Sequence, residues 1–147
     1  MSLPDWLANG WLVAHTASRD EVEGLVAVVD RELADAAVVG LSVDAQLTHT
    51  YSAGLQLATI ALAAAGYRPG RQRAHERTIQ SLAFTVGSAP ATVDLFDLVR
   101  RKRNNAIYEQ VGTATATEVA ELKVAVKALR GEVKRWLKHH HPSLSPR

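Results

Sequence analysis

The sequence contains no cysteine in its 147 residues. Without thiols the chain has no disulfides, no thiolate nucleophile and no zinc–thiolate site. It also lacks an apolar run that could cross a bilayer, which takes about 20 residues, because its longest low-polarity stretch, residues 55–66, is interrupted by Gln56 and Thr59. Residues 1–17 lack the basic start of a secretion signal. We therefore expect a cytoplasmic protein that does not bind a membrane.

Several catalytic signatures are missing as well. The sequence has no Gly-rich phosphate loop, no nucleophile elbow and no carboxylate pair at a catalytic spacing. Among the six histidines, His75 has no second ligand at helical spacing, and residues 139–141 lie at the end of the last predicted helix. The sequence therefore predicts neither a cofactor nor a physiological metal site.

Helix signals are frequent, whereas strand signals are nearly absent. Ser18 to Glu21 has the pattern of a capping box, and Gly40, Gly66 and Gly87 are placed as helix stops. We expect one all-α domain over residues 1–147, an up-and-down bundle of four long helices with one or two shorter ones. The predicted helices cover about residues 4–15, 19–39, 43–65, 73–86, 90–110 and, after a cap at Thr115 or Thr117, up to 140, followed by a polar tail at 142–147.

Two of these helices indicate how the bundle packs. The helix at 43–65 is rich in alanine and contains Gly54, so neighbouring helices can approach it closely. The last helix has apolar residues spaced by three and four, which favours shallow antiparallel packing. Its apolar seam consists of Val119, Leu122, Val126, Leu129, Val133 and Trp136.

The two halves of the chain carry opposite charge. Residues 1–66 hold two basic and eight acidic side chains, for a net charge of −6, and residues 67–147 hold fifteen basic and seven acidic ones, for +8. One interpretation is two solvated faces, which would complement each other across a dimer. The other is a basic surface for a polyanion.

The densest basic segment lies in the predicted helix at 90–110. Residues 100–105 contain four cations followed by two asparagines. At about 100° per residue, Arg103 falls on the apolar side of this helix with Phe96 and Val99, whereas Arg101 and Asn104 point away. Because an arginine keeps its charge, Arg103 must meet a carboxylate, a phosphate, a carbonyl or water.

This segment resembles a family motif. Arg103 and Asn104, with Tyr108 four residues after Asn104, follow an alanine-rich helix and turn at 54–69, as in small bacterial HEPN proteins (higher eukaryote and prokaryote nucleotide-binding). The resemblance covers a core of about residues 20–140. It implies a HEPN-like bundle and a homodimer in which two motif helices face each other across a basic cleft.

The resemblance also implies a function. Catalytic HEPN proteins are metal-independent endoribonucleases whose motif is arginine, a polar residue, three variable residues and histidine; here Arg103 and Asn104 match, and Tyr108 stands at the histidine position. Tyrosine, with a pKa near 10, is a poor general base at neutral pH. We therefore expect a toxin- or defence-type module that binds RNA or a nucleotide, with degenerate or absent RNase activity, and a possible nucleotidyltransferase-type antitoxin as partner. The expected phosphate-binding residues are Arg100, Arg101, Lys102, Arg103 and Asn105.

Alternatives remain open from the sequence. In a non-catalytic interaction or scaffold protein, Arg103 would form a structural ion pair with a carboxylate such as Asp30 or Asp44. A second basic cluster at the predicted turn before residue 77 is either a solvated connection or an extension of the cleft. The cluster consists of Arg68, Arg71, Arg73 and Arg77, together with His75 and Glu76.

Overall fold

The computed structural model describes the backbone of residues 1–108 and 114–147 and the side chains of residues 1–104 and 114–147. These parts are mostly helical, which agrees with the all-α prediction at the level of class. The elements are α1 (Leu3–Ala8), β1 (Leu12–Ala14), α2 (Arg19–Ala36), α3 (Val43–Ala64), β2 (Tyr67–Pro69), α4 (Ala74–Gln80), a 3₁₀ turn η1 (Ser81–Ala83), α5 (Pro90–Tyr108) and α6 (Ala116–His140).

The N-terminal segment differs from the prediction of a helix over residues 4–15. Helix α1 ends at Ala8, and Gly10 takes a left-handed conformation (φ +78°) that turns the chain into strand β1. Strand β1 pairs antiparallel with β2, and Leu12 lies opposite Pro69. The sequence carries almost no signal for these strands, because two three-residue strands are too short to produce an alternating apolar pattern.

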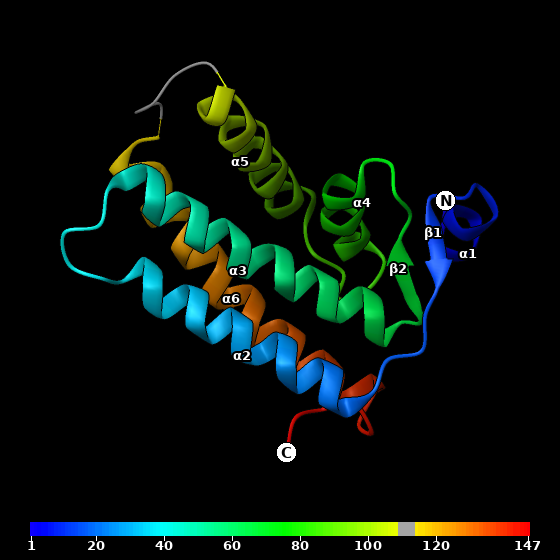
Figure 1. Cartoon of the computed structure of the whole chain (residues 1–147). Coiled ribbons are helices and arrows are strands. Elements are labelled where there is room, and N and C mark those ends of the chain that lie inside the picture. Colours follow the sequence, from blue (N-terminus) through cyan, green and yellow to red (C-terminus); the bar gives the residue numbers. More distant parts are fainter. Residues whose placement is uncertain (109–113) are drawn as a thin grey trace.

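Helices α2, α3 and α6 form the main body of the protein (Figure 1). Capping was predicted correctly at Ser42 and Thr115, whose side chains accept from the amides of Ala45 and Glu118. At α2, the Ser18 hydroxyl accepts from the Glu21 amide, but the Glu21 carboxylate contacts His15 instead of returning to the cap. Only half of the predicted capping box is therefore present there.

Helix α3 is the centre of the packing, since it contacts α2, α4, α5 and α6. Its small residues Ala53, Ala58 and Ala61 are fully buried, as the alanine-rich pattern predicted. The seam of α6 is buried from Val119 to Val133 and ends at Leu137 rather than Trp136. Opposite charges link α6 to α2 within one chain, because Arg130 forms two hydrogen bonds to Asp30, 2.8 and 3.2 Å long.

Helices α4 and α5 pack against α3 and against each other, and Figure 1 shows α5 and α2 on opposite sides of α3. Helix α4 is shorter than predicted, because the chain tightens into η1 after Gln80. Leu144 packs against the main core, so the segment predicted as a polar tail is partly attached to the bundle. Within the described residues, no helix has the length and apolar character needed to cross a membrane.

Candidate functional site at the junction of α3, α4 and α5

The orientation of α5 agrees with the helical wheel drawn from the sequence. Phe96 and Val99 are buried against the core, and Arg103 follows them on the same face. Arg101 and Asn104 lie on the exposed face, as predicted. The apolar side of α5 thus carries one guanidinium toward the body of the protein.

Arg103 meets an aromatic ring of α3. Its guanidinium carbon lies 5.4 Å from the centre of the Tyr51 ring. Its Nε atom is buried and has no hydrogen-bond partner. Among the described side chains, no carboxylate forms an ion pair with Arg103, and Asp30, one predicted partner, is paired with Arg130. The structural ion pair that the scaffold alternative predicts for Arg103 is therefore not found among the described side chains.

Tyr51 presents a second unsatisfied polar atom at the same place. The residue is 1% exposed, and its hydroxyl has no hydrogen-bond partner. Burial raises the pKa of Tyr51 to about 12, although Arg103 and Arg100 act in the opposite direction. The hydroxyl is therefore a proton donor at neutral pH. Buried donors without acceptors are costly, and here two of them come from facing helices.

The other cations of the predicted phosphate-binding segment have carboxylate partners. Arg100, 19% exposed, donates to Asp97 Oδ1 over 3.0 Å, and Arg101 Nε lies 3.5 Å from Asp97 Oδ2. Lys102 pairs with Glu118 at the start of α6. That bond is the main reason why the pKa of Glu118 lies below its usual range. Arg103 is distinguished from its neighbours by the lack of such a partner among the described side chains.

The side chains of Asn105 and Tyr108 lie outside the described residues. The roles predicted for these two positions, including that of the tyrosine at the family's histidine position, stay predictions. Asn104 is described and is exposed on the outer face of α5.

His75 of α4 lies within the electrostatic influence of Arg103 and Arg100. In the sequence it belongs to the second basic cluster and is not linked to Arg103. The imidazole keeps contact with solvent, yet partial burial, followed by the nearby charges of Arg103 and Arg100, lowers its pKa. A neutral imidazole donates at one nitrogen and accepts at the other. No sequence signal connects His75 to Arg103, because the two residues lie on different helices. We call Tyr51, His75, Arg100 and Arg103 the basic site.

A second group of arginines lies before and within the N-terminal half of α4. The guanidinium carbon of Arg77 lies 3.6 Å from the centre of the Trp11 ring and 5.6 Å from that of Trp6. Arg71, Arg73 and Arg77 line a pocket of about 410 Å³ together with Trp11. We call this the tryptophan pocket. Arg73 forms two hydrogen bonds to Glu76, so it is partly neutralised.

Comparison with known proteins adds no assignment: no family model matches the chain, and no curated protein or solved structure is similar to it. The HEPN resemblance thus depends on the α5 motif and the helix order. The basic site offers no cluster of three metal ligands; in the described ranges such a cluster occurs only between α2 and α3.

Proposed function

We propose that this protein binds RNA or a nucleotide by a phosphate group at the basic site. The observation that supports this most strongly is the half-buried Arg103 guanidinium, which lacks a carboxylate partner among the described side chains. It lies over the ring of Tyr51, whose hydroxyl is also unpartnered. A phosphate oxygen accepts from both donors, and hydrogen bonds between ionised groups are the stronger kind. The ligand would thus satisfy two polar atoms that the described protein atoms leave unsatisfied.

The chemistry of the basic site favours an anion with several acceptor oxygens. Arg103 supplies a permanent charge, Tyr51 an O–H donor and His75 a neutral imidazole. Arg100 adds a second guanidinium, although Asp97 offsets part of its charge. These groups come from three different helices, so the position of the anion is fixed by the packing of α3, α4 and α5.

A nucleic acid strand, rather than a single phosphate, fits the arrangement along α4. On α4, His75 feels the charges of Arg103 and Arg100, and Arg77 lines the tryptophan pocket. Aromatic rings beside guanidinium groups are typical of single-strand binding, in which bases stack and cations contact the backbone. From the HEPN resemblance alone, we also propose that the protein is a homodimer and a toxin- or defence-type module with a nucleotidyltransferase-type antitoxin as partner.

RNase activity in this proposal is weak or absent, and His75 is the group that would support it. A neutral imidazole would accept the proton of the RNA 2′-OH while that oxygen attacks its own phosphate. The bond to the 5′-oxygen of the next nucleotide breaks, this oxygen takes a proton from the solvent, and a 2′,3′-cyclic phosphate is left. Arg103 would stabilise the negative charge that develops on the phosphate oxygens. This role for His75 replaces the one that Tyr108 cannot fill at neutral pH.

A non-catalytic interaction or scaffold protein is the second candidate. It is favoured by the ion pairs of Arg100, Arg101 and Lys102, which account for three of the four cations at 100–103 as structural groups. Under this interpretation, Arg103 packs on Tyr51 as a cation–π contact and binds nothing else.

The test is the affinity for a fluorescently labelled single-stranded RNA, measured by anisotropy over a range of salt concentrations. We expect Arg103→Gln to weaken binding about 10- to 100-fold, the effect of losing a charge-assisted hydrogen bond, and to reduce the salt dependence. The matched control is Arg135→Gln, which removes an exposed charge from α6.

The two candidates give different results. If both variants are folded by circular dichroism and bind RNA with equal affinity, the proposal that RNA binds at the basic site is wrong. Unfolding of Arg103→Gln would support the scaffold interpretation, and in that case Arg103→Lys, which keeps the charge but loses the planar fork, separates stability from binding. An RNA affinity that does not fall with rising salt, in the wild type and in a folded Arg103→Lys variant, would refute the proposal.

A further inference from the structure

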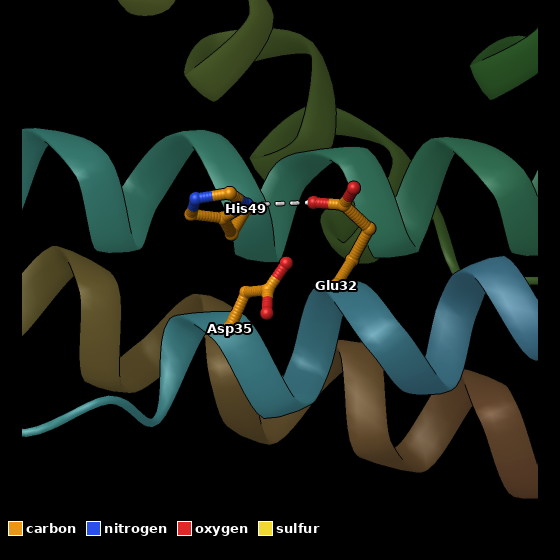
Figure 2. A group of neighbouring side chains, drawn as sticks. All are labelled: Glu32, Asp35 and His49. Carbon is orange, nitrogen blue, oxygen red and sulfur yellow. Dashed lines mark hydrogen bonds and ion pairs between the residues drawn. The ribbon is translucent and has the colours of Figure 1, made fainter.

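Three side chains on α2 and α3 converge on one point, away from the basic site. Figure 2 shows the carboxylates of Glu32 and Asp35 on α2 turned toward the imidazole of His49 on α3. One ligand atom from each residue lies within 4.8 Å of the other two. Because Glu32 and Asp35 are three residues apart, they share one face of α2.

The ordinary explanation accounts for only two of the three residues. His49 Nδ1 lies 2.8 Å from Glu32 Oε2, which is a common interhelical contact. The Asp35 carboxylate has no cation paired with it among the described side chains. Lys123 reaches this end of α2, but it donates to the carbonyl of Ala36 and to Gln46 Oε1.

The group is also partly removed from solvent. All three residues are half-buried, and the Glu32 side chain is 14% exposed. Two carboxylates held close together in such a place repel each other, and Arg31 contributes only one exposed contact, 3.4 Å from Glu32 Oε1. A small cation between the three ligand atoms would offset this repulsion.

We propose that Glu32, Asp35 and His49 form a binding site for a divalent transition-metal ion such as Zn²⁺. Carboxylate oxygens and imidazole nitrogens are both ligands of Zn²⁺, and three protein ligands leave a fourth position for water. Bonds of about 2.0–2.2 Å require the three atoms to move together slightly, and the metal replaces the hydrogen bond between His49 and Glu32. The bound ion connects α2 to α3, and the proposal does not depend on RNA binding.

The test uses the full-length protein after removal of metal, titrated with ZnCl₂ in a calorimeter. We expect one Zn²⁺ per chain at this site and a higher melting temperature in the presence of Zn²⁺. Asp35→Asn is the decisive variant, because Asp35 takes no part in the His49–Glu32 hydrogen bond. We expect it to weaken Zn²⁺ binding at least about tenfold, with an unchanged melting temperature in the absence of metal.

The histidines at 139–141 are a separate source of metal binding and supply the control. A variant with all three replaced by glutamine should keep the site on α2 and α3. If Zn²⁺ binding is lost in this variant and unchanged in Asp35→Asn, the proposal is wrong and the ion binds only adventitiously to the tail. If Asp35→Asn melts at a lower temperature without metal, His49→Gln is used instead, and wild-type Zn²⁺ affinity in that variant would also refute the site.

Discussion

Gly54 of α3 lies directly against the ring of Phe96 of α5, in the helix interface that also contains Tyr51 and Arg103. A Cβ atom on Gly54 would lie 2.5 Å from Phe96 Cε1, which is shorter than real contacts of this kind. Phe96 is 1% exposed, so its ring has little room to move. One turn before Gly54 and two turns after Phe96 lie Tyr51 and Arg103. The close approach of the two helices therefore sets the position of Arg103 over Tyr51.

The first prediction is that the close packing of α3 on α5 does not tolerate a side chain at Gly54. Gly54→Ala should lower the free energy of unfolding by about 1–3 kcal/mol, the usual cost of overpacking a core. Gly24→Ala is the matched control, because a Cβ on Gly24 meets nothing within 4 Å; alanine there should stabilise α2 by up to about 1 kcal/mol. Urea unfolding of the two variants measures both effects, and equal stabilities would contradict the tight contact.

The second prediction separates binding from stability at Tyr51. Tyr51→Phe removes a buried hydroxyl that has no partner, so the free energy of unfolding should stay the same or rise by about 1 kcal/mol. RNA affinity should fall about tenfold, because the phosphate loses one hydrogen-bond donor. Chemical denaturation and fluorescence anisotropy on the same preparation measure the two quantities. A stabilised variant with unchanged RNA affinity would show that Tyr51 does not contact the ligand.

The third prediction is a pH dependence of binding through His75. Burial, and then Arg103 and Arg100, hold the pKa of His75 below its ordinary value of 6.5. A bound phosphate offsets the two arginines and so raises this pKa, which means that the complex takes up a proton. RNA affinity should therefore increase as the pH falls from neutral through the pKa of the free protein. In His75→Gln the increase should be smaller, and an identical pH profile would exclude His75 from the site.

The lowered pKa of His75 also makes the stability of the free protein depend on pH, and here a fall in pH is unfavourable. Because the folded state favours the neutral form of His75, its contribution to stability is full above pH 6.5 and is lost as the pH falls through the lowered pKa. His75→Gln should therefore reduce the acid sensitivity of the free protein between pH 6.5 and that lowered value. Thermal melts of the variant and the wild type across this range test the sign.

The fourth prediction concerns the ion pair between α5 and α6. Hydrogen bonding to Lys102, the largest cause, lowers the pKa of Glu118 below 4.5. The resulting stability is present above pH 4.5 and is lost as the pH falls through the lowered pKa. Lys102→Met should therefore be less stable than the wild type at neutral pH and equally stable at the acid end. Lys127 is an exposed lysine on α6. In thermal melts, the difference in stability between Lys127→Met and the wild type should not change with pH.

The helices with strong local signals could be predicted from the sequence. Ser42 and Thr115 cap α3 and α6 as expected, and the wheel of α5 placed Arg103 inward. The strands could not be predicted, because the pairing of Leu12 with Pro69 depends on tertiary contact rather than on a local pattern. In β1 and β2, contacts between residues far apart in the sequence decide the conformation.

The candidate sites were predicted only in part, for the same reason. Arg103 stood out because a charge on an apolar face is visible in one helix. Its neighbours Tyr51 and His75 belong to two other helices, and nothing in the spacing of the chain relates them to α5. Likewise, Glu32 and Asp35 share a helical face, but the approach of His49 follows from the packing of α3 on α2. The spacing of residues in a single sequence predicts which of them share a helix face, but it does not predict which residues of other helices pack against that face.

The pairing of β1 with β2 also has a kinetic consequence. The pairing places residue 12 opposite residue 69, and it also places the Trp11 ring against the Arg77 guanidinium. The loop that must close spans most of the first half of the chain, and closing a long loop costs conformational entropy before its contacts form. The tryptophan pocket should therefore form late in folding, after α2 and α3 have paired. Tryptophan fluorescence would follow this step separately from the gain of helix.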